Sequence, residues 1–239
     1  MYGHRARIGY TSPPLMAEVV PFEFYKIVPE GVTLVLTTLA VTRLGPDEID
    51  RSYDMSVQAA RAMAKVGVDV VVLGGALVNL SRGDDEAAAL MRTLEAELGV
   101  KVSTSAAAQE KAVRTLGCRN VVIAHPYGPG ESARQSGYAE RFGCKVLGCA
   151  GWGSTLAEFG RIPRDAALQM GRALMREHPQ ADAILLPSPH WPTIEAIAPL
   201  EREFGVSVVT ALQAAVWDAL RLVGIVDRID GYGRLLREF

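Results

Sequence analysis

Short apolar runs rich in β-branched residues recur along this sequence, and stretches with helical periodicity separate them. Eight such runs occupy residues 6–10, 32–38, 68–73, 101–104, 120–124, 145–149, 181–186 and 207–210. Strands that alternate with helices predict an α/β fold, because a helix usually connects neighbouring parallel strands. The alternation of such runs with helices is typical of a parallel sheet.

The sequence also resembles itself. Residues 68–73 are similar to 181–186, and 32–38 to 145–149, both at an offset of 113, while 99–104 is similar to 205–210 at an offset of 106. These matches predict two copies of a four-stranded α/β unit. Few residues are identical between the matched segments. The alternative to a duplication is that the regular alternation of strands and helices in any α/β protein produces this similarity.

We therefore expect two similar four-stranded parallel-sheet halves related by a pseudo-two-fold axis. The N-terminal half would be 1–116 and the C-terminal half 117–211, with a last helix and tail at 212–239 that packs back on the N-terminal half. Ligands of open parallel sheets bind beyond the carboxyl ends of the strands. The active site is thus expected in the cleft between the halves, lined by loops 11–14, 74–79, 125–130, 151–155 and 187–191.

Charge and composition argue against several classes of partner. With 25 Lys and Arg against 27 Asp and Glu, the net charge of -2 gives no general attraction to nucleic acid or to an anionic membrane. No segment has the length and apolarity of a membrane span or a signal peptide, so we expect a soluble, cytoplasmic protein. Cys118, Cys144 and Cys149 lack a CxxC spacing, which favours reduced thiols. Neither a metal-binding nor a nucleotide-binding motif is present, and we expect no metal and no cofactor.

Five segments carry a resemblance to one enzyme family: 9–14, 70–83, 124–127, 185–197 and 231–235. Together they are similar, nearly end to end, to the arylmalonate decarboxylase and maleate cis–trans isomerase family of the aspartate/glutamate racemase superfamily. The pair Pro13-Pro14 and the segment 217–222 resemble the decarboxylase side more. This resemblance implies cofactor-free proton chemistry beside a bound carboxylate, through an enediolate.

The resemblance further implies a cysteine at the end of the third strand of one or both halves. Gly75 and Ser188 occupy these positions, and none of the three cysteines aligns with either. A serine hydroxyl is a much weaker acid than a thiol and needs a base before it can attack. The sequence therefore argues against a two-cysteine racemase mechanism and predicts a changed acid.

The loop 187–192 contains the two candidates for catalysis. Its prolines favour an extended chain, so Ser188 and His190 are expected to project to the same side of the cleft. His190 would be the proton donor or base, and Ser188 its hydrogen-bonding partner or a nucleophile. The alternative is that Ser188 only ends a strand and that His190 is a polar residue at the rim.

Two regions are candidates for holding a substrate carboxylate. Backbone N–H groups near Gly75 and near Pro189-His190 could bind it without a side chain. Tyr127 matches the family tyrosine whose hydroxyl donates to the carboxylate. In the decarboxylase the stretch after the glycine carries hydroxyl residues, and here Ala76 and Leu77 occupy the matching positions. This wall of the pocket is therefore more apolar than the same wall in the decarboxylase, which would suit an aryl or alkyl substituent.

Two further residues complete the set of substrate-binding candidates. Pro14 would line the cleft at the end of the first strand, and Ser154 could offer another hydrogen bond. A helix N-cap is the simpler interpretation of Ser154 and its neighbour Thr155.

The leading hypothesis is a cofactor-independent lyase or isomerase acting on a small carboxylate. A hydrolase with Ser188 as nucleophile and His190 as base is one alternative, and a non-catalytic relative that binds small carboxylates is another. The sequence leaves the substrate and the oligomeric state open, and a homo-oligomer is compatible with it.

Overall fold

The described chain forms two sheets. The computed structural model describes residues 1–239 apart from the side chain of Asp84. Within this range two four-stranded parallel sheets form, in the orders β2-β1-β3-β4 and β6-β5-β7-β8, and confirm the predicted fold class. The strands are β1 (Ala6–Pro14), β2 (Val32–Val41), β3 (Val70–Leu73), β4 (Lys101–Thr104), β5 (Asn120–His125), β6 (Lys145–Gly151), β7 (Ala183–Leu186) and β8 (Ser207–Thr210).

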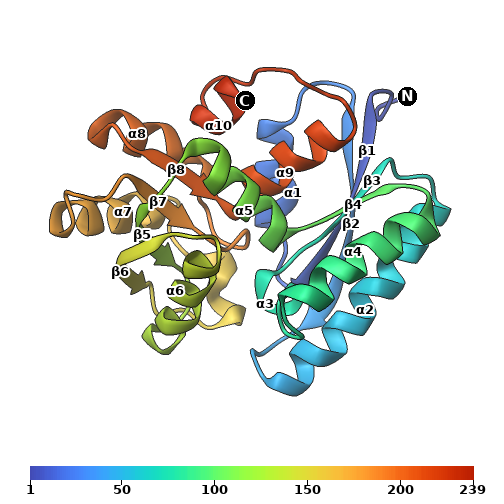
Figure 1. The fold of residues 1–239 in the computed structure, drawn as a ribbon, viewed down its shortest axis with the longest axis horizontal. Coiled ribbons are helices and arrows are strands. Elements are labelled where there is room, and N and C mark those ends of the chain that lie inside the picture. Colours follow the sequence, from blue (N-terminus) through green and yellow to red (C-terminus); the bar gives the residue numbers. More distant parts are fainter.

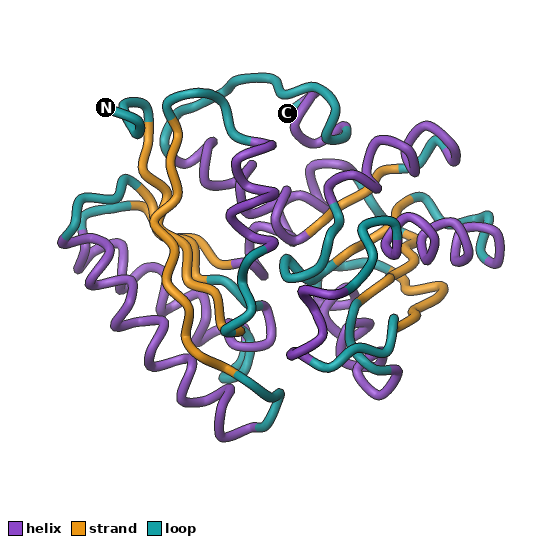
Figure 2. The backbone as a smooth tube through the Cα atoms, turned by 180° about the vertical axis from the view of Figure 1, so that it is seen from behind, coloured by secondary structure: helices purple, strands orange, loops and turns teal.

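Helices connect the strands and cover both sheets (Figure 1). They are α1 (Val19–Ile27), α2 (Pro46–Lys65), α3 (Ala76–Asn79), α4 (Asp84–Leu98), α5 (Ser105–Leu116), α6 (Ser132–Arg141), α7 (Ala166–Glu177), α8 (Ile194–Phe204), α9 (Ala211–Leu222) and α10 (Arg234–Glu238). Seen from behind, the two sheets stand apart, with helices packed between them (Figure 2).

The predicted repeat is visible in the topology, because each strand of one sheet has a counterpart at the same place in the other. Asp69 and Asp182 play the same part in the two halves. The Asp69 carboxylate accepts a hydrogen bond from the N–H of Arg7 at 2.7 Å, and that of Asp182 accepts from the N–H of Arg119 at 2.9 Å. Each aspartate thereby ties the start of its third strand to the start of the first.

Strand β1 runs four residues further than the sequence pattern predicted. Its pairing with β2 continues, across an irregularity, to the pair Pro14 and Val41, but its pairing with β3 ends at Thr11. Pro13 and Pro14 therefore lie where a missing N–H removes no hydrogen bond to β3. The extension carries this end of the strand toward the C-terminal half.

The last helix lies between the two halves. α9 follows β8 in the chain but also contacts α5, α1, β3 and β4, and α10 packs on α5, α9 and β8. Arg5 and Asp227 form an ion pair of 2.6 Å that joins the tail to the N-terminus. These contacts support our proposal that 212–239 packs back on the N-terminal half and that the halves divide near residue 116.

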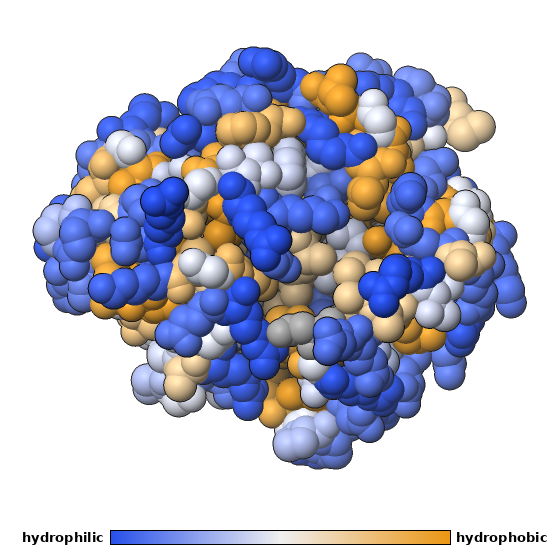
Figure 3. Space-filling view, viewed as in Figure 1, coloured by the Kyte–Doolittle hydropathy of each residue, from blue (hydrophilic) through white to orange (hydrophobic). Residues whose placement is uncertain are grey.

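One hydrophobic cluster contains buried residues of both halves, including Ile8 and Phe24 from one and Ile184 and Trp191 from the other. This shared core holds the facing loops of the two halves in place. Among the described residues, no helix combines the length and apolarity needed to cross a bilayer. The face in Figure 3 is mostly hydrophilic, with some apolar surface where the halves meet.

Candidate active site

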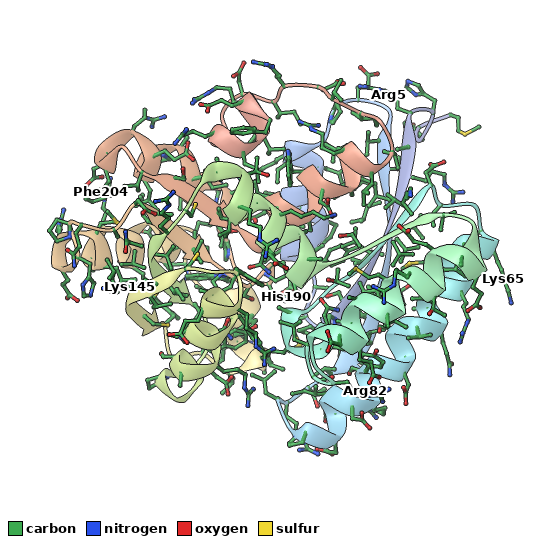
Figure 4. All side chains as sticks on the ribbon, viewed as in Figure 1. Arg5, Lys65, Arg82, Lys145, His190 and Phe204 are labelled. Atoms are coloured by element: carbon green, nitrogen blue, oxygen red, sulfur yellow. The ribbon has the colours of Figure 1, made fainter. Side chains whose placement is uncertain are left out.

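A pocket lies between the halves at the carboxyl ends of their strands, as predicted. It encloses about 520 Å³ of empty space, its open mouth included. Its wall is mainly apolar. The lining residues, which we call the site pocket, are Pro13, Pro14, Val41, Leu44, Ile49, Gly75, Ala76, Leu77, Val78, Tyr127, Gln135, Tyr138, Leu156, Pro187, Pro189 and His190. His190 is seen between the two halves in Figure 4.

Most of the candidates from the sequence are brought together here. Seven of them line the site pocket: Pro14, Gly75, Ala76, Leu77, Tyr127, Pro189 and His190. Ser188 is fully buried between two lining residues, Pro187 and Pro189. Ser154 does not line the pocket, and of the five predicted loops only 151–155 contributes no lining residue.

Ser188 is an acceptor of two hydrogen bonds. The hydroxyl of Tyr127 donates to its Oγ at 3.5 Å, and so does the backbone N–H of His190, also at 3.5 Å. In both hydrogen bonds the Ser188 oxygen is the acceptor. The hydrogen of the Ser188 hydroxyl has no acceptor among the described residues. Such an arrangement stabilises negative charge that develops on that oxygen.

The ring of His190 bonds a different serine from the one that the sequence suggested. Its Nε2 lies 2.9 Å from the Oγ of Ser12, at the end of β1 in the other half. The expectation that Ser188 is the partner of this ring is wrong, because the chain turns after Ser188 and only its backbone N–H meets that hydroxyl. Nδ1 of His190 has no partner among the described residues.

Burial keeps His190 neutral. Its side chain is 3% exposed, and removal from water lowers the pKa of the imidazole to about 3. At neutral pH the ring is therefore a hydrogen-bonding group rather than a cation. Which nitrogen carries the proton depends on the direction of the bond to Ser12.

Tyr127 is the polar residue best placed to meet a ligand. It follows β5 and lines the site pocket, and its ring centroid lies 5.3 Å from that of Phe159 and 5.8 Å from that of His125, with the rings tilted against each other. Burial raises the pKa of its hydroxyl, so the group stays a protonated donor at neutral pH. This hydroxyl donates to Ser188 and so links the wall of the site pocket to the loop 187–192.

Backbone donors lie opposite, at the start of α3. The first hydrogen bonds of this short helix are made by the N–H groups of Val78 and Asn79 to the carbonyl of Gly75. The N–H groups of Ala76 and Leu77 precede them and are not used within the helix. Because the site pocket has no Lys, Arg, Asp or Glu among its described lining residues, an anion in it would depend on such N–H and hydroxyl donors.

Ser154 and His125 have local roles. The N-cap of the 3₁₀ helix Leu156–Arg161 is Thr155, whose side chain and N–H bond Glu158, whereas the N–H of Ser154 donates to Pro126. His125 is fully buried and its Nε2 contacts the Oγ of Ser132 at 3.0 Å. Burial lowers the pKa of the His125 imidazole to about 4. Neither residue reaches the site pocket.

The wall around Gly75 has no room for a side chain. A Cβ at this position would lie 2.5 Å from Cγ of Pro13, and the backbone has a φ of +84°. Glycine tolerates this conformation, whereas other residues are strained in it. A cysteine could therefore not stand here without a shift of Pro13, which agrees with its absence from the sequence.

Replacement of Gly75 by alanine is expected to destabilise the protein more than replacement of Gly83. Gly83 also has a positive φ, +98°, but nothing lies within 4 Å of a Cβ there. Both variants carry the backbone strain, and only Gly75→Ala adds the collision with Pro13, which should cost about 1–3 kcal/mol more. Urea unfolding of both variants measures the difference. If both variants lose the same free energy of unfolding, Pro13 shifts away from the new Cβ at no measurable cost.

Several lining residues had no signal in the sequence. Gln135 and Tyr138 lie three positions apart on α6 and share one helix face, but only the packing of α6 decides that this face meets the pocket. Ser12 belongs to a predicted loop, yet its partner stands 178 positions away. A polar residue on a partly buried helix face is a weak clue, since many such residues contact solvent.

The thiols lie elsewhere. Cys118 and Cys144 are buried near each other, with the Sγ of Cys144 3.8 Å from the carbonyl of Cys118. Burial raises the pKa of Cys118 to about 12 and that of Cys144 to about 11. Cys149 is half-buried, and no cysteine lines the site pocket. In the part of the chain that is described, no group of three or more His, Cys, Asp or Glu could hold a metal ion.

Comparison with known proteins gives consistent results. A family model described as arylmalonate decarboxylase matches residues 8–236. The arylmalonate decarboxylase of Bordetella bronchiseptica is 30% identical over 233 residues, which cover 97% of this chain and 96% of that protein.

Solved structures agree with that match. One is a liganded arylmalonate decarboxylase variant, in which a glycine is replaced by cysteine and a cysteine by serine. It has a TM-score of 0.87 and 29% identity, over 96% of this chain and 98% of its own. The maleate cis–trans isomerase of Nocardia farcinica bound to Tris shares the fold, with a TM-score of 0.85 and 21% identity over 98% of each chain.

Proposed function

The chain belongs to the arylmalonate decarboxylase family, and from this premise we propose that it removes one carboxyl group from a small substituted malonic acid without a cofactor. The observation that supports this reaction best is the hydroxyl network at the carboxyl ends of β5 and β7. Tyr127 lines the site pocket and donates to Ser188, whose own proton is free.

In the proposed reaction the site pocket first binds the carboxylate that the substrate keeps. The N–H groups of Ala76 and Leu77 and the hydroxyl of Tyr127 would donate to it. Loss of CO₂ leaves an electron pair on the α-carbon, delocalised into that carboxylate as an enediolate. Preorganised donors lower the barrier because the negative charge on these oxygens grows in the transition state.

The second half of the reaction replaces the lost carboxyl by a proton. The α-carbon takes the proton of the Ser188 hydroxyl, and the electron pair of the O–H bond stays on Oγ. As negative charge moves from the enediolate to Oγ, the single proton of Tyr127 turns from the carboxylate back to Oγ, where the resting structure has it. Together with the N–H of His190 it stabilises the charge on that oxygen until the serine regains a proton from solvent. These donors partly compensate for the weak acidity of serine relative to cysteine.

His190 is assigned a binding role in this scheme. A neutral ring held at Nε2 by Ser12 lines the site pocket and fixes the shape of its wall, while its Nδ1 is buried and has no partner among the described residues. With an imidazolium pKa of about 3, the ring is seldom charged at neutral pH, so it is a poor general acid.

The hydrolase alternative has less support. A serine nucleophile needs a base that accepts its proton. The His190 ring bonds Ser12 rather than Ser188, so no base accepts the Ser188 proton among the described contacts. A non-catalytic carboxylate-binding protein stays as the competing hypothesis.

The test is a substrate screen in heavy water. Phenylmalonate, alkylmalonates, maleate, amino acids and hydantoins would be incubated with the protein, and CO₂ and products measured by NMR. We expect CO₂ only from malonates, with one deuterium at the α-carbon of the monoacid. Turnover of maleate or hydantoins alone would contradict the proposal, as would binding of phenylmalonate with no CO₂ above the uncatalysed rate.

A further inference from the structure

A second cavity lies directly beside the site pocket. Its empty space is about 280 Å³ with the open side included, and its interior has room for little more than one water-sized group. We call it the inner cavity, and it is lined by Ala76, Gln109, Ile123, Gln135, Tyr138, Ala139, Phe142, Leu185 and Pro187. Four of these residues, Ala76, Gln135, Tyr138 and Pro187, also line the site pocket. The two spaces therefore adjoin, and a substituent of a bound substrate could extend from one toward the other.

Gln135 is the most informative residue of the shared wall. Its side chain, on α6, is 4% exposed and lines both spaces, yet it has no hydrogen bond to any described residue. Its amide atoms are not among the polar atoms that are fully buried without a partner, so they keep accessible surface where the side chain lines the two spaces. A ligand that displaces water from them must replace its hydrogen bonds, or about 1–3 kcal/mol is lost. A buried amide that lines a cavity and has no partner in the protein is suited to a partner that comes with a ligand.

Two further polar groups line the inner cavity. Gln109 is 5% exposed, and its amide nitrogen donates to the carbonyl and the hydroxyl of Ser105, at 2.9 and 3.2 Å. Its carbonyl oxygen thus remains as an acceptor. Tyr138 is half-buried, and burial raises the pKa of its hydroxyl to about 12, so this group is a donor at neutral pH.

The chemistry of these groups selects against charge. The described lining of the inner cavity contains no Lys, Arg, His, Asp or Glu. A carboxylate or an ammonium group there would lose its hydration without a counter-ion, which is far more costly than burying a neutral polar group. A hydroxyl or a carboxamide can both donate and accept, as the two amides and the phenol require.

We propose that the inner cavity is a specificity subsite for a neutral hydrogen-bonding group on the far end of the substrate's substituent, and that Gln135 is its main recognition residue. The substrate class is then a malonic acid whose aryl or alkyl substituent ends in a hydroxyl or carboxamide. This inference rests on the proposed function, since it places the substituent relative to a carboxylate held at Tyr127.

The test compares phenylmalonate with 4-hydroxyphenylmalonate. Wild type should prefer the hydroxylated substrate by at least about tenfold in kcat/KM, because a site built around a hydroxyl penalises its absence. Gln135→Leu, which keeps similar bulk, should lower that preference by about tenfold or more, mainly through KM for the hydroxylated substrate. Tyr138→Phe should lower it in the same direction. Gln58→Leu, an exposed glutamine on α2, should leave the preference unchanged.

Calorimetric binding of phenylacetate and 4-hydroxyphenylacetate separates this inference from the proposed reaction. Thermal melts of each variant establish that it is folded. If neither malonate is turned over but wild type binds 4-hydroxyphenylacetate more tightly and Gln135→Leu does not, the reaction is wrong and the subsite is right. An equal preference in wild type, Gln135→Leu and Tyr138→Phe, by turnover or by binding, would overturn the subsite.

Discussion

Replacement of Ser188 by alanine is expected to lower kcat for malonate decarboxylation by about 10²–10⁴-fold, the usual contribution of a positioned general acid. The serine is fully buried, and its oxygen accepts hydrogen bonds from Tyr127 and from the N–H of His190. Alanine removes the proton and leaves the two donors without their acceptor. Steady-state CO₂ release together with deuterium incorporation at the α-carbon measures the loss.

The matched variant is Ser188→Cys. A thiol has an ordinary pKa of about 8.5 and is a far better acid than a serine hydroxyl. We expect it to restore turnover at least to the wild-type level, since the donors around position 188 also stabilise a thiolate. If Ser188→Ala keeps wild-type turnover, the proton comes from elsewhere. His190→Ala would then show whether the neighbouring ring supplies it.

Replacement of Tyr127 by phenylalanine is expected to lower kcat/KM by about 10²–10³-fold, the usual effect of removing one donor from an oxyanion site. The ring contacts with Phe159 and His125 are kept, so the variant should fold. The loss should fall mainly on kcat, because the hydrogen bond strengthens as charge develops on the enediolate.

A tyrosine outside the pocket gives the control. Tyr53 is buried on α2 under the guanidinium of Arg82, and Tyr53→Phe should not change turnover. Because Tyr127 also donates to Ser188, the double variant Tyr127→Phe, Ser188→Ala should lose less than the product of the single losses. If Tyr127→Phe keeps the wild-type kcat, the Tyr127 hydroxyl takes no part in the reaction.

The site could be predicted from the sequence where it depends on strand ends. Gly75, Tyr127 and Pro189 each follow a buried strand, and in a parallel sheet such positions gather at one edge. The family resemblance then predicted which of these positions meet a substrate, and that assignment stays a prediction. Ser154 also follows a strand but lies outside the pocket, since the chain turns back at this point and its N–H bonds Pro126.

The contacts across the cleft could not be predicted in the same way. Ser12 and His190 come from different halves and are 178 positions apart in the sequence. A hydrogen bond between two such side chains does not produce any periodic pattern from which it could be predicted. The position of Gln135 depends on how α6 is rotated against β5 and β6. Its helical spacing is compatible with a solvent-facing residue as well as with a cavity wall.

By itself the sequence determined the α/β class, the two halves and the edge where a ligand would bind. Local periodicity and burial produce these features, and Asp69 and Asp182 occupy equivalent positions in the two halves. Only the tertiary structure decided that Ser12 holds the His190 ring, that Tyr127 and His190 donate to Ser188, and that an uncharged cavity lies behind Gln135. These are distances between side chains on separately formed elements, and packing of the two halves sets them.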